Sequence, residues 1–182
     1  MAKAIAMVEF MTVASGVSAA DTMVKTSEIE LMEATVVCPG KYIILICGDL
    51  SAVKAAVESA KKKHGDRLVD SYVLGNPHES IFPAIYGATE IENPKALGIV
   101  ETYSAASIIA AADFAAKTAE VQLIEIRIAR GMCGKSYMFL TGDVAAVTAS
   151  VERAKQSAAD GGMLLDTSVI ANPDEKTWRN IL

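Results

Sequence analysis

The sequence predicts an α/β fold of the α+β type, built as two tandem βαββαβα repeats. Three observations lead to this prediction. The chain has 182 residues, 52% of them hydrophobic, which is enough to bury a core. It aligns with itself over nearly its whole length. Within each copy, short apolar runs alternate with segments whose apolar residues recur at helical spacing.

The internal repeat divides the chain into two predicted domains, 1–92 and 93–182, joined around Asn93-Pro94. The offset between matching residues is 92 at first, then 94, then 96. Matching pairs include Glu9 with Glu101, Asp21 with Asp113, Lys25 with Lys117, Gly40-Lys41 with Gly134-Lys135, Gly48-Asp49 with Gly142-Asp143, Asp70 with Asp166, and Asn76-Pro77 with Asn172-Pro173.

Each copy is expected to open with a strand, residues 4–9 in the first copy, followed by a helix. Three apolar residues at helical spacing predict this helix: Val17, Ala20 and Val24. Ser15 is available as its N-cap. The matching helix in the second copy, residues 105–119, is rich in alanine and can therefore pack close to a sheet.

Two strands follow, residues 29–37 and 42–47, and the second is an apolar run typical of a strand covered on both faces. A helix comes next, with one apolar face in each copy. Its predicted members are Val53, Ala56, Val57 and Ala60, and in the second copy Val144, Val147, Val151 and Ala154. A fourth strand, residues 68–74, and a short helix after Asn76-Pro77 complete the unit.

The turn between the second and third strands carries a cysteine, Cys38. Pro39 cannot donate to a strand ladder and Gly40 tolerates positive φ, so the chain reverses here with the thiol at the apex. A thiol on a turn is a candidate for metal or redox chemistry, although an unliganded turn cysteine remains the alternative. Cys47 lies in an apolar strand and is expected in the core.

Composition makes several classes of function improbable. A formal charge of -5 and scattered aromatic residues argue against nucleic acid as a partner. No apolar run reaches membrane-spanning length, so we expect a cytoplasmic protein without a membrane segment. Three cysteines argue against a disulfide framework. The two histidines lack a nucleophile at recognisable spacing, so we expect no enzyme.

The repeated motifs resemble the bacterial microcompartment shell domain, or BMC domain, which has a ferredoxin-like-related fold. The motifs are the strand ending in Val-Glu, the helix with Asp and Lys four residues apart, the Gly-Lys turn and the following Gly-Asp. Cys38-Pro39-Gly40-Lys41 and Trp178-Arg179 are most similar to the tandem-domain shell proteins of the propanediol-utilisation type. In place of the Arg-Pro-His stretch common at the edge of such domains, residues 75–78 read Gly-Asn-Pro-His.

The resemblance implies a homotrimer shaped as a pseudohexamer, assembled with other shell proteins into the microcompartment shell. It also implies one [4Fe-4S] cluster per trimer, ligated by three Cys38 at the central pore, for electron transfer across the shell. An encapsulated redox enzyme is then a further partner. The implied edge residues of the tile are Lys25 and Lys117.

The loops expected at the pore are unlike in the two copies. In the second copy Arg130 replaces Cys38, and the loop is longer. The predicted pore residues besides Cys38 are Pro39, Gly40, Lys41, Arg130, Gly131, Met132, Cys133, Gly134 and Lys135. Cys133 could supply a second ring of thiols or be incidental, and the two lysines could lie near the axis or be solvated turn residues.

Two other functions fit the sequence. One is a metabolite-conducting shell pore without a metal centre, in which Cys38 has no ligand. The other is a small-ligand-binding α/β sensor, which the order of predicted elements alone would allow.

Overall fold

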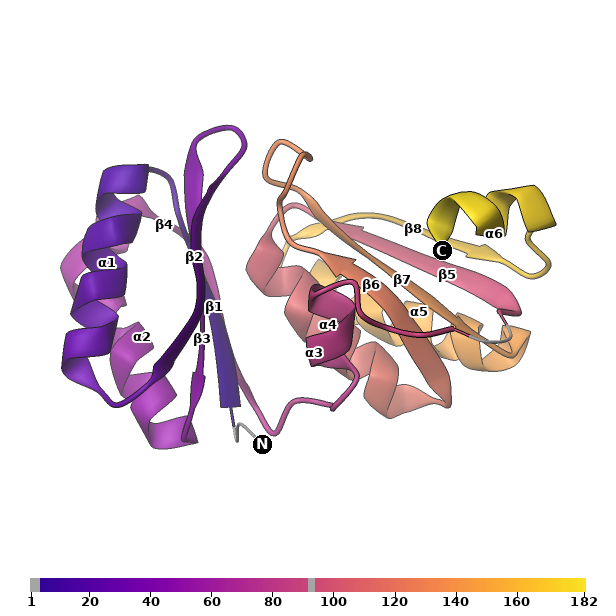
Figure 1. Ribbon diagram of the computed structural model, residues 1–182, viewed down its shortest axis with the longest axis horizontal. Coiled ribbons are helices and arrows are strands. Elements are labelled where there is room, and N and C mark those ends of the chain that lie inside the picture. The colour runs from indigo at the N-terminus through magenta and orange to yellow at the C-terminus, as the bar shows by residue number, and fades with distance from the viewer. Residues whose placement is uncertain (1–3, 92–93) are drawn as a thin grey trace. The chain divides into compact units, whose positions relative to one another are not determined.

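The computed structural model describes residues 4–91 and 94–182, and both halves follow the predicted order βαββαβα (Figure 1). The predicted domain boundary between residues 92 and 93 lies outside the described residues. The first half contains β1 (Ala4–Phe10), α1 (Val13–Thr26), β2 (Glu30–Val37), β3 (Lys41–Gly48), α2 (Leu50–His64), the 3-10 turn η1 (Gly65–Arg67), β4 (Leu68–Gly75) and α3 (Ile81–Ile85). The second half contains β5 (Ala96–Thr102), α4 (Ala105–Thr118), β6 (Val121–Arg127), β7 (Ser136–Gly142), α5 (Val144–Asp160), β8 (Leu164–Ile170) and α6 (Glu175–Ile181).

The chain forms two compact units whose borders do not follow the repeat. Unit 1 holds the described part of Met1–Pro77 together with two segments of the second half, Ser104–Ser107 and Ala129–Gly134. Unit 2 holds the described rest of the chain from His78. The start of α4 and the loop before β7 therefore belong with the first sheet. Conversely, α3 comes from the first half but packs against β6 in unit 2.

Unit 1 is built on an antiparallel sheet with strand order β2-β3-β1-β4. Alternate residues of β1 point to one face and pack against α1 and α2. The second helix buries Val53, Ala56, Val57 and Ala60, as its sequence predicted. All five residues of β3 from Ile43 to Cys47 are buried, which confirms a strand covered on both faces.

Helix α1 forms as predicted, but only one of the three apolar residues that indicated it, Ala20, is buried. The buried residues are Gly16, Ala19, Ala20 and Met23, while Val17 and Val24 are exposed. The N-cap is Thr12 rather than Ser15, because the Thr12 hydroxyl accepts a bond from the Ser15 backbone N–H at 3.4 Å. Valine spacing indicated a real apolar stripe, but this stripe does not face the sheet of unit 1.

Close packing at Gly16 helps to explain which face of α1 lies against the sheet. A Cβ on Gly16 would lie 2.3 Å from Cβ of Tyr42, so only glycine lets α1 approach β3 at this point. In the second copy the matching residues are Ile108 and Ser136, with the large and small side chains exchanged. The two copies therefore fill the same position with opposite partners.

Unit 2 has a sheet with the matching order β6-β7-β5-β8. Helix α5 covers one face with Val147, Val151 and Ala154, whereas Val144, at the first position of the helix, was predicted on this face and is exposed. Trp178 of α6 packs with Leu97 and Ile124. Leu97 precedes Gly98, which faces α5, so α6 lies on the opposite side of the sheet from α5.

Candidate functional site

The Cys38 turn connects β2 to β3 in unit 1, with Cys38, Pro39 and Gly40 all exposed. The Gly40 N–H donates to the Val37 carbonyl at 2.9 Å, and Gly40 has φ +108°, a conformation that favours glycine. The predicted reversal is therefore confirmed. Its effect is to leave the thiol at the apex of the turn, exposed to solvent.

A second loop lies against this turn. A Cβ added to Gly134 would be 3.3 Å from the carbonyl oxygen of Cys38 and 2.9 Å from Nζ of Lys41. The preceding residue, Cys133, is exposed. The two unlike loops expected at the pore, 38–41 and 130–135, thus meet within unit 1 along Ala129–Gly134.

The cations of these loops have different surroundings. The Arg130 guanidinium forms an ion pair with Glu33 of β2. Lys41 is mostly buried, and its Nζ lies 3.0 Å from Oε2 of Glu9, so it is not a solvated turn lysine. Lys135 is exposed. Two of the three cations therefore carry compensating carboxylates.

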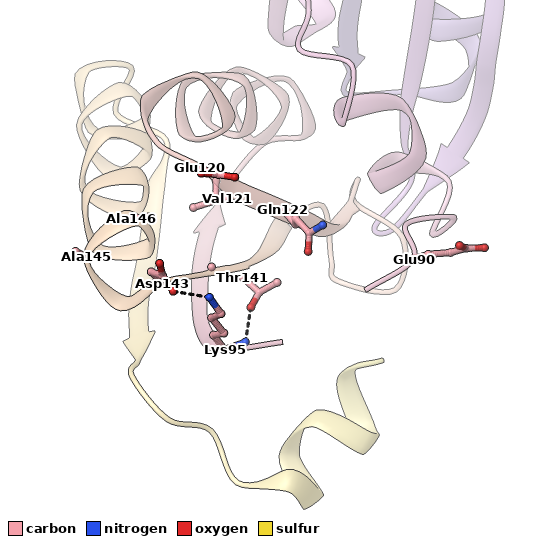
Figure 2. A pocket seen from close by; sticks show the side chains of 10 residues that line it. Glu90, Lys95, Glu120, Val121, Gln122, Thr141, Asp143, Ala145 and Ala146 are labelled. Carbon is pink, nitrogen blue, oxygen red and sulfur yellow. Dashed lines mark hydrogen bonds and ion pairs between the residues drawn. The ribbon is translucent and has the colours of Figure 1, made fainter. Parts of the chain in front are cut away.

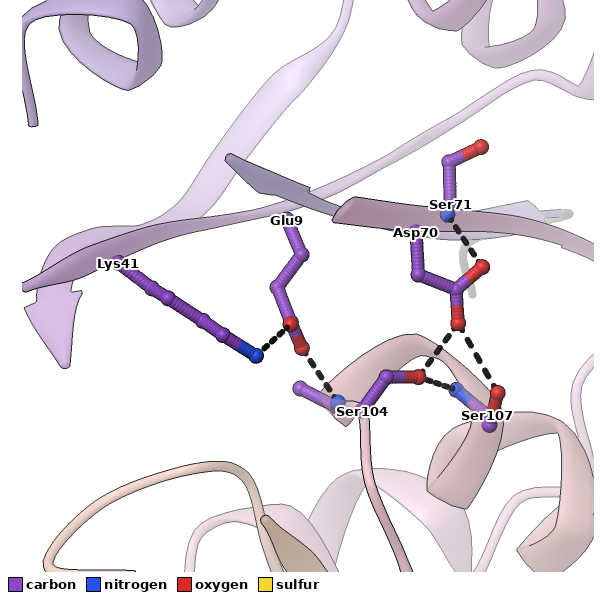
Figure 3. A network of polar contacts seen from close by, with 7 residues as sticks. Glu9, Lys41, Asp70, Ser71, Ser104 and Ser107 are labelled. Atoms are coloured by element: carbon purple, nitrogen blue, oxygen red, sulfur yellow. Dashed lines mark hydrogen bonds and ion pairs between the residues drawn. The ribbon is translucent and has the colours of Figure 1, made fainter. Parts of the chain in front are cut away.

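Glu9 is fully buried and connects three segments of unit 1 (Figure 3). One carboxylate oxygen forms an ion pair with Lys41, and the other accepts a hydrogen bond from the backbone N–H of Ala105 at the start of α4. Burial raises the pKa of Glu9 above its ordinary value of 4.5, and the Ala105 N–H and the Lys41 charge oppose that rise. These contacts give Glu9 a structural role in unit 1.

Asp70 of β4 holds the same helix start from beside Glu9 (Figure 3). Its Oδ2 accepts bonds from the hydroxyls of Ser104 and Ser107, the latter at 2.9 Å, and its Oδ1 accepts the Ser71 N–H at 2.8 Å. We name Glu9 and Asp70 together the first socket. Sequence reasoning missed it, although a glutamate inside an apolar strand was a visible signal.

No single chain supplies a complete metal site in the part that the structure describes: no group of three His, Cys, Asp or Glu side chains could hold an ion there. The Cys38 turn offers one thiol, which fits a metal cluster only if other chains contribute theirs. Cys47 is buried as predicted, and its Sγ donates to Glu30 at 3.6 Å. Burial, with the nearby Glu30 carboxylate, raises the pKa of the Cys47 thiol, which disfavours it as a ligand.

The predicted edge lysines both end helices. Lys25 of α1 is exposed and pairs with Asp21 at 2.8 Å. Lys117 of α4 pairs with Asp113 at 2.7 Å, and this nearly buried aspartate also accepts the backbone N–H of His78. The matching ion pairs confirm the repeat, but Lys117 has the more restricted setting.

Unit 2 also contains a groove of about 880 Å³ where α5 begins (Figure 2). Lys95 lies in it. Its Nζ is 2.7 Å from Oδ1 of Asp143, and its backbone N–H donates to the hydroxyl of Thr141. Glu90 and Glu120 line it as well. The groove contains no cysteine and is formed without any residue of the Cys38 turn.

Both copies match the model of the BMC domain, at residues 4–77 and 96–173. The chain therefore belongs to the BMC-domain family, the family of bacterial microcompartment shell proteins, as a member with two tandem domains. A relative is the bacterial microcompartment shell protein PduT of Citrobacter freundii, which is 41% identical over 182 residues, covering 100% of this chain and 99% of that protein.

Solved structures agree. A microcompartment protein from Desulfitobacterium hafniense has 47% identity and a TM-score of 0.87, over 97% of this chain and 98% of that one. A fused permuted hexameric shell protein from the RMM microcompartment shares the fold, with a TM-score of 0.63 at 19% identity over 85% of this chain and 81% of that one. Among the described helices, none has the length and apolar character needed to cross a membrane.

Replacing Lys41 with Met should destabilise the protein strongly, by about 3–5 kcal/mol, because it leaves the buried Glu9 carboxylate without its cation. The loss should be smaller at pH 5 than at pH 8. Glu9 has a raised pKa, so its charged form opposes folding as pH rises above 4.5, and protonation removes the need for Lys41. Denaturant unfolding at both pH values measures this.

Lys61→Met is the matched control, since Lys61 pairs with Glu58 on the surface at 3.3 Å. It should change the unfolding free energy little at either pH. An equal loss for Lys41→Met at pH 5 and pH 8 would contradict the role given to Glu9.

Proposed function

We propose that three chains close into a pseudohexameric ring whose axis is lined by the Cys38 turns and the 130–135 loops in alternation. Two features support the ring. The chain contains two unlike copies of one unit, so three chains provide six similar positions. The two loop types are already neighbours within unit 1, where Gly134 lies against Cys38 and Lys41.

At this axis, three Cys38 thiolates would hold one [4Fe-4S] cluster per trimer. The observation that carries this proposal is the exposed thiol at the apex of a turn that β2 and β3 fix in place. Thiolates are the usual ligands of such clusters. Three thiolates leave one iron for a different ligand. When bound, the cluster supplies one-electron redox chemistry.

The protein's own residues would set the surroundings of the cluster. Arg130 is paired with Glu33 and Lys41 with Glu9, so neither brings an uncompensated charge. Lys135 is exposed, and its positive charge can stabilise the negative charge of the thiolate-bound cluster. A ring of this kind would pass electrons across the shell between the cytoplasm and an encapsulated redox enzyme, without catalysis by the shell protein itself.

Cys38→Ser should abolish the cluster and leave the trimer intact, because serine keeps the turn but removes the thiolate. Anaerobically purified wild-type protein should be brown, with about one cluster per trimer. Iron and sulfide content, together with electron paramagnetic resonance after reduction, measure the effect.

Two matched variants serve as controls. Cys133→Ser removes the other exposed thiol, and Cys47→Ser removes the buried one; both should keep the colour and the iron content. Wild-type iron and signal in Cys38→Ser would show that Cys38 is not the ligand. A colourless wild type would favour a metabolite pore without a metal centre.

We further propose that Lys25 and Lys117 act at the tile edge, between trimers and other shell proteins. Their positions at the ends of matching helices support this. Replacing both with Ala should abolish two-dimensional sheets. Loss of the exposed Lys25–Asp21 pair should lower the melting temperature little, since such a pair contributes about 0.3–0.5 kcal/mol. Loss of Lys117 should lower it more, because Asp113 is nearly buried and is left without its cation. Electron microscopy of assemblies and thermal unfolding measure the two effects. A large loss of trimer stability would place the lysines inside the trimer instead.

A further inference from the structure

In unit 1, the two carboxylates of the first socket accept hydrogen bonds from the N-terminus of helix α4. Glu9 accepts the N–H of Ala105, the first residue of α4, and Asp70 accepts the hydroxyls of Ser104 and Ser107. Carboxylates are favourable at this position because the first N–H groups of a helix have no partner within the helix. Every one of these contacts lies within unit 1.

The second copy repeats the parts of this socket. Glu101 and Asp166 match Glu9 and Asp70, and we name them the second socket. Oδ1 of Asp166 accepts the Thr167 N–H at 2.8 Å, just as Oδ1 of Asp70 accepts that of Ser71. Its carboxylate is therefore oriented in the same way, with Oδ2 available for a helix start.

The matching helix start is that of α1. Thr12, Val13 and Ser15 match Ser104, Ala105 and Ser107. The Thr12 hydroxyl donates to Ser15 instead of to an aspartate. Within the described residues, neither the Glu101 carboxylate nor the Val13 N–H has a hydrogen-bond partner, whereas Glu9 and Ala105 are bonded to each other.

The apolar stripe of α1 is also exposed to solvent. Val13, Val17 and Val24 are 41–51% exposed. Their counterparts in α4, Ala105, Ile109 and Ala116, are at most 8% exposed. One copy of the repeat thus has this helix face covered, and the other copy presents valines at the same three positions.

We propose that the second socket takes the start of α1 from a second copy of this chain. The inference rests on the proposed ring and names the contact that closes it. Each chain has one open socket and one open helix start of complementary chemistry, so the contact is head-to-tail and repeats until the ring closes. Glu101 accepts the Val13 N–H, Asp166 accepts the Thr12 and Ser15 hydroxyls, and the valine stripe becomes buried.

Val13→Pro tests the contact at a single atom. Proline at the first helical position keeps the helix, and Thr12 already has the extended conformation that must precede proline, with φ -135° and ψ 148°. The variant therefore loses the N–H and exchanges the valine side chain for the apolar ring of proline. Sedimentation at decreasing concentration should show the trimer dissociation constant raised at least tenfold, with unchanged denaturant unfolding of the dissociated chain.

Glu101→Ala should weaken the trimer similarly. Val13→Pro combined with Glu101→Ala should add little to either change alone, because both remove one bond. Ala105→Pro is the matched control: it removes the equivalent N–H inside unit 1, so it should lower the unfolding midpoint of the dissociated chain.

The outcomes separate the two proposals. A wild-type chain that stays monomeric overturns the ring and the socket together. A wild-type trimer whose dissociation is unchanged in both Val13→Pro and Glu101→Ala overturns the socket alone. If Val13→Pro lowers the unfolding midpoint of the isolated chain, the chain's own socket is the partner and the contact between copies is wrong.

Discussion

The buried carboxylate of Glu9 is the constraint on which unit 1 depends. A charge in the interior requires both a counter-ion and hydrogen bonds, and Glu9 finds them in Lys41 of β3 and in the N–H of Ala105. These partners come from a strand of the first copy and from a helix of the second. The first copy is therefore completed by the second, and the compact units do not coincide with the repeats.

Duplication then left two copies free to diverge at matching positions. Gly16 packs against Tyr42 in one copy, whereas Ile108 and Ser136 occupy these positions in the other. The same divergence at the loops replaces Cys38 by Arg130 and adds Cys133. A cysteine present in one copy only would occur three times around a ring of three chains. A site with three thiolates, rather than six, would then follow from the divergence of the two copies.

Much of the fold was predictable because the repeat supplied each element twice. The order of elements, the α2 face and the Cys38 turn were all confirmed. Helix α1 also forms as predicted, but Val17 and Val24 form a regular stripe that the sheet of unit 1 leaves exposed. Periodicity identifies an apolar stripe, but it does not say whether the same chain covers it.

The polar part of the site was beyond prediction for a different reason. Glu9 and Ala105 lie far apart in sequence, and the donor is a backbone N–H, which no side-chain motif reveals. Lys41 could equally have been a solvated turn residue until the structure placed it on Glu9. Only the glutamate inside an apolar strand, found again as Glu101, indicated that such a contact exists.

The molar mass of the purified wild-type protein, by light scattering in line with size-exclusion chromatography, tests the ring of three chains most directly. We expect three chain masses, because each chain supplies two unlike positions of a six-position ring. A stable monomer or a ring of six chains would contradict it.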